Sequence, residues 1–244
     1  MKALQRLIFL SILFSSLSVT SFAQQYRILI SNDDGIASPL LKTLSEELAK
    51  LPNVEVVISA PAENQSGSSQ STDGRELTVE KIYNDDQFFG YAVSGRPADA
   101  VQFGIRVLGK ENPFDLVISG INRGANVGDI SHQSGTVGAA MEALLYNTAA
   151  IAVSQEVRGV NTQASALFIA QLVRKYQKDG APEGVVISVN IPAGELKGVA
   201  VRPMGDAYLD MGNYNLTSET GNKMVYTQRL GLTRSKDEAS DTYA

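Results

Sequence analysis

Short apolar runs alternate along most of this chain with longer segments in which apolar residues recur at helical spacing. The runs are apolar along their whole length and rich in β-branched residues, which is typical of strands buried on both faces of a parallel sheet. We predict strands at 26–31, 54–60, 114–119, 149–154 and 184–190, separated by helices at 38–51, 97–108, 134–146 and 162–178. This order predicts an α/β fold with a doubly wound, mostly parallel sheet.

Two shorter runs interrupt this alternation. Residues 77–82 and 91–94 have strand-like composition and are separated by a polar, charged segment at 84–87. We interpret them as a β-hairpin insertion with an exposed tip.

The pattern weakens after residue 202. Residues 204–222 are rich in Gly, Asn and Ser, and 223–230 is a further candidate strand. The last ten residues are polar and are expected to be disordered or to depend on a partner. We therefore expect an α/β domain at 24–202, followed by a short, irregular or β-rich C-terminal extension at 203–244.

The first 23 residues have the pattern of a secretory signal peptide. Lys2 and Arg6 provide positive charge, residues 7–17 are almost wholly apolar, and Ser21-Phe22-Ala23 ends in a small residue. The apolar run is shorter than the roughly 20 residues that span a bilayer, and an uncleaved anchor is the alternative. We expect cleavage after Ala23 and an exported protein, periplasmic or secreted, without membrane contact after cleavage.

The charge and the side-chain composition exclude several classes of site. The chain is acidic, with a net charge of −5, and so lacks the basic surface of a protein that binds nucleic acid polymers. It has no cysteine and one histidine, His132, which excludes disulfides, thiolate ligands, a cysteine nucleophile and multi-histidine zinc sites. A small anion can still be held by backbone donors or by a metal.

Three polar loops follow three of the predicted strands, at 32–35, 61–69 and 120–126. Open parallel sheets bind ligands in the crevice outside the carboxyl ends of their strands. Because all three loops open onto that edge, we expect their side chains to converge.

Adjacent carboxylates in the first loop point to a metal. Asp33 and Asp34 would repel each other in a confined site unless a cation lay between them. With the Ser66 hydroxyl and the Asn122 amide oxygen they form an all-oxygen set suited to one Mg²⁺ or Mn²⁺ ion. The alternative is an ordinary turn, with one Asp capping the helix that begins near Ser38.

The segment that begins at Ser134 has the features of an anion site. Ser134 is a good N-cap, Gly135 allows a ligand to approach the backbone, and a helix start presents free N–H groups and a positive dipole end. The alternative is a plain helix start, in which the small residues at 138–140 permit close packing. His132 is either an acid–base group or a solvated loop residue, and Arg123 either faces phosphate or is an ordinary loop cation.

Successive segments of the chain resemble the motifs of the SurE survival-protein family. They are ILISNDDGI (28–36), AP with the following QSG (60–61 and 65–67), GRPAD (95–99), SGINRGAN (119–126), SGTVGAAME (134–142) and NIP (190–192). The resemblance extends over about residues 26–192. It implies a Rossmann-like fold, metal-dependent 5′/3′-nucleotidase activity on nucleoside monophosphates, and oligomerisation through the C-terminal extension.

The resemblance also implies a role for individual residues. The metal ligands would be Asp33, Asp34, Ser66 and Asn122, with Asp33 and Asp34 as the catalytic pair. The residues lining the phosphate site would be Asn126, Ser134, Gly135 and Thr136.

These observations predict a phosphomonoester hydrolase that uses one divalent ion, Mg²⁺ or Mn²⁺. Its expected substrates are nucleoside 5′-monophosphates, with 3′-monophosphates as a further class, and a homodimer or homotetramer is expected. One alternative is an exported acid phosphatase or polyphosphatase of broad specificity. Another is a periplasmic binding protein that holds a phosphorylated ligand without hydrolysing it, although such a protein needs no paired carboxylates.

Overall fold

The computed structural model describes residues 25–74, 76–206, 209–232 and 235–243, and the predicted signal peptide lies outside these residues. A seven-stranded sheet forms its centre, in the order β3-β4-β2-β1-β5-β6-β7. Neighbouring strands are parallel, except for the antiparallel pair β3 and β4. The strands are β1 (Tyr26–Ser31), β2 (Val54–Pro61), β3 (Val79–Asn84), β4 (Gln87–Val93), β5 (Leu116–Arg123), β6 (Ala149–Gln155) and β7 (Val186–Ile191).

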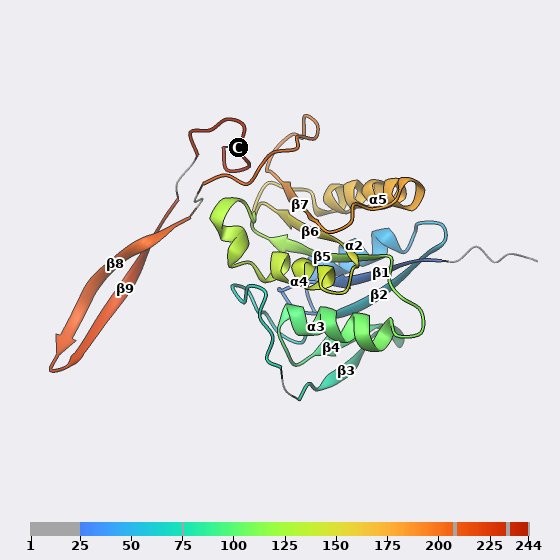
Figure 1. The fold of residues 1–244 in the computed structure, drawn as a ribbon, viewed down its shortest axis with the longest axis horizontal. Coiled ribbons are helices and arrows are strands. Elements are labelled where there is room, and N and C mark those ends of the chain that lie inside the picture. Colours follow the sequence, from blue (N-terminus) through green and yellow to red (C-terminus); the bar gives the residue numbers. More distant parts are fainter. Residues whose placement is uncertain (1–24, 75, 207–208, 233–234, 244) are drawn as a thin grey trace, which may run out of the picture.

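Helices cover both faces of this sheet (Figure 1). They are α2 (Pro39–Leu48), α3 (Pro97–Phe103) continued by the π-helix η1 (Gly104–Leu108), the 3-10 helix η2 (Gly128–His132), α4 (Gly135–Leu144) and α5 (Thr162–Asp179). α2 packs with α5, and α3 with α4. No helix within the described ranges is long and apolar enough to span a membrane.

The central strand β1 supplies apolar side chains to two separate cores. Ile28 and Ile30 join the core that contains Leu44 of α2 and Ile169 of α5, whereas Leu29 joins the core that includes residues of α3 and α4. Successive side chains of a strand point to opposite faces, so a wholly apolar strand needs cover on both sides. The predicted doubly wound, mostly parallel α/β fold is confirmed.

Strands β3, β4 and β5 differ in their bounds from the predicted strands at 77–82, 91–94 and 114–119. β3 and β4 form the expected hairpin, and its turn residues Asp85 and Asp86 have φ angles of 48° and 64°, as a tight two-residue turn requires. β5 does not end at Ser119 but continues to Arg123, with a shift in its pairing to β6 between Ser119 and Asn122. Part of the predicted polar loop is therefore the end of a strand.

The C-terminal extension contains a long hairpin that projects from the domain (Figure 1). Its strands are β8 (Leu209–Thr220) and β9 (Lys223–Leu232), which pair with each other in an antiparallel sheet of their own. The sequence pattern predicts β9 but not β8. The side chains at 214–220 are exposed, so this part of β8 has no alternating burial, and the strand is defined by its pairing with β9.

Residues 235–243 fold back onto the domain, contrary to the expected disorder. Thr242 is buried, and the two carboxylate oxygens of Asp241 accept hydrogen bonds from the backbone N–H groups of Gly205 (2.7 Å) and Gly128 (3.2 Å). A polar segment can be ordered in this way because its side chains satisfy backbone groups that would otherwise need water. The tail therefore packs beside η2, which leads into α4.

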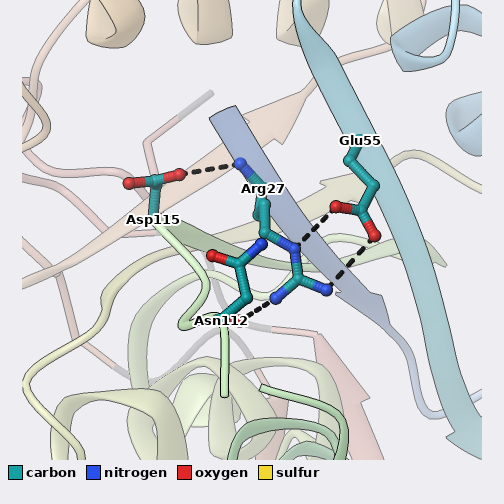
Figure 2. Close-up of polar contacts among 4 residues, drawn as sticks. All are labelled: Arg27, Glu55, Asn112 and Asp115. Carbon is teal, nitrogen blue, oxygen red and sulfur yellow. Dashed lines mark hydrogen bonds and ion pairs between the residues drawn. The ribbon is translucent and has the colours of Figure 1, made fainter. Parts of the chain in front are cut away.

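A buried arginine joins three segments at the amino ends of the central strands (Figure 2). Nε and Nη2 of Arg27 donate to the two carboxylate oxygens of Glu55 at 2.7 and 3.2 Å, and Nη1 donates to the carbonyl oxygen of Asn112. Its backbone N–H donates to Oδ2 of Asp115 at 2.7 Å, and its guanidinium lies 4.4 Å from the ring centroid of Phe114. The network holds β1, β2 and the start of β5 together at the end of the sheet opposite to the polar loops.

Candidate metal and phosphate site

The residues predicted to hold a metal lie at one edge of the sheet. Asp33 and Asp34 follow β1, Ser66 lies in the loop after β2, and Asn122 is near the end of β5. These three strands are neighbours in the sheet, and their carboxyl ends therefore meet at the edge where open parallel sheets bind ligands. The loop after β2 is tied to this edge, because the backbone N–H of Gln65 donates to the carbonyl oxygen of Asp33 at 2.7 Å.

Asp33 is almost completely buried, with 3% of its surface exposed. Its Oδ1 accepts a hydrogen bond of 2.6 Å from Oγ1 of Thr136, in the first turn of α4. Burial raises the pKa of Asp33; the hydrogen bond from Thr136 opposes this rise, and the charge of Asp34 adds to it. The carboxylate is thus fixed in orientation but is costly to ionise in the metal-free protein.

Asp34 is half-buried, and its carboxylate is also costly to ionise in the metal-free protein. Burial raises its pKa, and the backbone amide and charge of Arg123 only partly oppose the rise. Its Oδ1 accepts from Nδ2 of Asn64 at 3.4 Å, but Oδ2 is buried and has no hydrogen-bond partner in the described part of the chain. Two adjacent carboxylates with raised pKa values destabilise a metal-free site. A divalent cation between them would remove that penalty, so the residues present fit such an ion.

Neutral oxygens complete this polar edge. Nδ2 of the buried Asn32 donates to the carbonyl oxygen of Gly35 at 2.9 Å, and its Oδ1 is buried with no partner among the residues that the structure describes. Nδ2 of Asn122 donates to the carbonyl oxygen of Gly124 at 2.7 Å, which directs the amide oxygen away from that contact. Among the described residues, no three or more His, Cys, Asp or Glu side chains lie together in a way that could bind a metal ion. A metal here would therefore need neutral oxygens as well as the two carboxylates.

The loop after β2 packs against the start of α4. Ser69 donates from its backbone N–H to the carbonyl oxygen of Gln133 (3.1 Å) and from its hydroxyl to the carbonyl oxygen of His132 (2.7 Å). Gly138 permits this contact, since a Cβ there would lie 2.3 Å from the carbonyl oxygen of Ser69. The exposed Ser66 therefore lies in a loop that is hydrogen-bonded, three residues later, to the segment just before α4.

The side chains of two helix-start residues predicted to line the phosphate site, Ser134 and Thr136, have hydrogen-bond partners within the protein. Oγ of Ser134 caps α4 by accepting from the backbone N–H of Val137 at 3.1 Å, as predicted for an N-cap. The hydroxyl of Thr136 is bonded to Asp33. The backbone N–H of Thr136 also bonds the Asp33 carboxylate, so what remains for an anion in the first turn is the backbone N–H of Gly135, which has no partner within the helix.

Asn126 is buried and is held by side chains of β6 and β7. Its Nδ2 donates to Oγ of Ser154 at 2.8 Å, and its backbone N–H and carbonyl pair with the side-chain amide of Asn190 at 2.8 and 3.1 Å. These bonds fix Asn126 at the same edge of the sheet. His132 and Arg123 both have exposed side chains, and Arg123 lies close enough to Asp34 to influence its pKa.

Three further residues at this edge are not evident from the sequence as site residues. Asn32 and Ser68 each have a buried oxygen without a partner among the described residues. Asp99, in the first turn of α3, is the third of these residues. Its Oδ2 accepts hydrogen bonds from the backbone N–H groups of Arg96 (2.9 Å) and Asp73 (3.0 Å). Asp99 therefore fastens the far end of the loop after β2. Turn-type residues such as these give no sequence signal that separates a site oxygen from an ordinary loop.

Known proteins share this architecture. The family model described as Survival protein SurE matches residues 28–211. The 5′-nucleotidase SurE of Methylobacillus flagellatus is 36% identical over 223 residues, which cover 89% of this chain and 87% of that protein. The 5′-nucleotidase SurE of Chlorobaculum tepidum is 33% identical over 231 residues, with coverage of 93% and 87%.

A solved structure of a SurE protein is also similar to this chain in its three-dimensional fold. The crystal structure of the SurE protein from Aquifex aeolicus matches with a TM-score of 0.74 and 32% sequence identity, and the match covers 89% of this chain and 88% of that one. The family match, the relatives and the solved structure agree with one another over most of the chain. The chain belongs to the SurE family.

Proposed function

We propose that this protein is a metal-dependent phosphomonoester hydrolase that releases orthophosphate from nucleoside 5′-monophosphates, with 3′-monophosphates as a second substrate class. The observation that carries the proposal is the adjacent pair Asp33 and Asp34, whose pKa values burial raises, beside the first turn of α4. The relatives named 5′-nucleotidase SurE support this substrate class.

One divalent ion, Mg²⁺ or Mn²⁺, would be held by oxygens of Asp33, Asp34, Ser66 and Asn122. Such an ion supplies Lewis acidity toward a phosphoryl group and toward the attacking water. The unpartnered oxygens at this edge support the assignment, because hard cations prefer a set of carboxylate, amide and hydroxyl oxygens.

The protein's own groups contribute orientation and charge stabilisation. Thr136 fixes the Asp33 carboxylate, and a fixed carboxylate can orient a water molecule by accepting its hydrogen bond. The backbone N–H of Gly135 at the start of α4 can donate to a phosphoryl oxygen, whose charge is redistributed in the transition state. Gly135, the first residue of α4, adjoins Asp33, since a Cβ there would lie 2.8 Å from Cβ of Asp33.

The substrate class is tested by measuring orthophosphate release from AMP, GMP, 3′-AMP, glucose 6-phosphate and tripolyphosphate, each with EDTA, Mg²⁺ or Mn²⁺. We expect release only with metal, and fastest release from the 5′-monophosphates. Equal or faster release from glucose 6-phosphate and tripolyphosphate would instead support the phosphatase of broad specificity. Nucleotide binding without release would support the binding protein.

We also propose that the protein is exported. The proposal rests on the charged, apolar and small-residue pattern of residues 1–23. Mass spectrometry of protein isolated after expression of the whole sequence is expected to give an N-terminus at Gln24. A protein that begins at Met1 and sediments with membranes would support the uncleaved anchor instead.

A homodimer or homotetramer is proposed as the assembled form. The hairpin β8–β9 projects from the domain (Figure 1), and among its described side chains five large apolar ones are exposed: Tyr214, Leu216, Met224, Val225 and Tyr226. Apolar side chains grouped on one exposed element are typical of an interaction surface. Light scattering of the purified protein should give the mass of two or four copies, and replacing the paired residues Leu216 and Tyr226 by Glu should reduce it. A wild-type monomer at micromolar concentration would contradict this assembly.

A further inference from the structure

The hydroxyl of Ser68 differs from its neighbours in the loop after β2. The hydroxyls of Ser69 and Ser71 donate to the carbonyl oxygens of His132 and Ser68, respectively. The Ser68 hydroxyl oxygen is shielded from solvent and has no hydrogen-bond partner in the described part of the chain. Buried polar groups are normally bonded, so this hydroxyl lacks a partner that some ligand could supply.

The Ser68 hydroxyl faces the start of α4. A Cβ added to Gly135 would lie 2.7 Å from Oγ of Ser68 and 3.1 Å from Oδ2 of Asp33. The hydroxyl and the carboxylate thus adjoin the same residue, the first of α4, whose backbone N–H has no partner within the helix. Ser68 therefore lies between Asp33, a proposed metal ligand, and the backbone of Gly135, a proposed phosphate donor.

The position of Ser68 is set by bonds on both sides of it. Its own backbone N–H donates to the carbonyl oxygen of Gln65 at 3.2 Å, and the next residue, Ser69, is bonded through backbone and side chain to the segment before α4. Gln70 then donates from Nε2 to Glu142 of α4 at 3.1 Å. These bonds fix the backbone that carries the Ser68 hydroxyl, and the hydroxyl has no partner among the described residues, so it is available to an external group.

From this arrangement we infer that the Ser68 hydroxyl donates a hydrogen bond to a phosphoryl oxygen of the substrate seated at the start of α4. The inference rests on the proposed phosphohydrolase function. An anion is the favoured partner because the N-terminal end of a helix attracts negative charge and disfavours cations. Ser68 then stabilises phosphate in the ground state and in the transition state, and its role is separate from that of the metal ligands.

The variant Ser68→Ala tests this role, with Ser218→Ala on the exposed hairpin as the matched control. A hydrogen bond to a charged group changes a binding constant by roughly tenfold to a hundredfold. We expect Ser68→Ala to weaken competitive inhibition by orthophosphate by about tenfold or more and to lower kcat/KM for AMP by a similar factor. The Mn²⁺ concentration for half-maximal activity and the melting temperature should stay close to those of the wild type and of the control.

Three results would overturn the inference. An unchanged inhibition constant for orthophosphate would show that Ser68 does not contact the phosphoryl group. A raised Mn²⁺ requirement with unchanged phosphate inhibition would assign the hydroxyl to the cation, and a lowered melting temperature with unchanged kinetics would assign it to packing. Calorimetry can also compare orthophosphate binding to the Mn²⁺-loaded wild type, Ser68→Ala and control proteins. This measurement needs no turnover, so a failure of the inference is distinguishable from a failure of the proposed activity.

Discussion

The hydroxyl of Thr136 donates a hydrogen bond of 2.6 Å to Oδ1 of Asp33, and this bond links the first turn of α4 to the end of β1. Both side chains are buried, so water does not compete for the bond and its geometry is well defined. The same contact connects the two halves of the proposed site, the metal ligands and the phosphate donors. Its loss should therefore affect both metal binding and turnover.

Thr136→Val removes this hydroxyl while keeping the shape of the side chain. We expect kcat with AMP to fall by about tenfold to a hundredfold, because the Asp33 carboxylate loses a charge-assisted hydrogen bond and its fixed orientation. The Mn²⁺ concentration for half-maximal activity should rise as well. Thr136→Ser retains the donor and should stay within about threefold of the wild type, whereas equal activity of the Val and Ser variants would argue against a positioning role.

The raised pKa of Asp33 predicts how the metal-free protein responds to pH. A carboxyl group whose pKa rises on folding favours the folded state below its ordinary value, 3.8, and this contribution is lost as the pH rises. The melting temperature of the EDTA-treated wild type should therefore fall between about pH 4 and neutrality through this group. Asp33→Asn has no charge and keeps an oxygen that can accept from Thr136, so at pH 7 it should melt at a higher temperature than the metal-free wild type.

Manganese should reverse that order of stability. Added Mn²⁺ should raise the melting temperature of the wild type, because binding to the folded state adds to its stability, and should raise that of Asp33→Asn much less. Asp86→Asn, in the exposed turn between β3 and β4, is the control and should behave as the wild type does. A metal-free Asp33→Asn protein that melts below the wild type at pH 7 would contradict the predicted cost of ionising the buried Asp33 carboxylate.

Gly138 determines how closely the loop after β2 can approach α4. A Cβ at this position would lie 2.3 Å from the carbonyl oxygen of Ser69 and 2.6 Å from the backbone nitrogen of Gln70. Because these are backbone atoms, Gly138→Ala must displace the loop, and we expect a loss of stability of about 1–3 kcal/mol together with lower kcat/KM. Met141→Ala, at an exposed position of the same helix, should change neither quantity appreciably. Unaltered kinetics in Gly138→Ala would show that the loop position is unimportant for catalysis.

The Arg27 network should affect stability without affecting chemistry. Arg27→Gln breaks the paired contacts to Glu55 (Figure 2) and the contact to Phe114, and we expect it to destabilise the fold by about 2 kcal/mol. Turnover of AMP at 25 °C and the Mn²⁺ requirement should be unchanged, since the network lies at the opposite end of the sheet. Arg106→Gln replaces an exposed arginine and serves as the control in urea unfolding. A large fall in kcat for Arg27→Gln, measured on folded protein, would show that the two ends of the sheet are coupled.

Local sequence patterns determine most of the α/β domain. β1, β2, β6 and the helix α5 lie within one or two residues of their predicted bounds, because buried parallel strands are wholly apolar and helices show a clear period. The convergence of the polar loops is likewise a consequence of strand order, and needs no knowledge of individual contacts.

Long-range contacts could not be predicted in the same way. Thr136 and Asp33 are 103 positions apart, and nothing in the helix-start motif distinguishes a hydroxyl that binds phosphate from one that holds a carboxylate. The hairpin strand β8 depends on pairing with β9, and the polar tail is ordered through the contacts of Asp241 with Gly205 and Gly128. In each case the determining partner is distant in sequence and leaves no local pattern.

The most direct test of the proposed site is a metal titration of activity. Wild-type protein and Asp33→Asn are stripped with EDTA, exchanged into chelator-free buffer and titrated with Mn²⁺ while orthophosphate release from AMP is recorded. The wild type should be inactive without metal and reach full activity in a saturable manner, whereas Asp33→Asn should stay at least about a hundredfold less active at every Mn²⁺ concentration, as expected for loss of a group that acts in the transition state. Full activity of the stripped wild type, or near-normal activity of Asp33→Asn with Mn²⁺, would contradict the assignment of Asp33 and Asp34 as the metal-binding catalytic pair.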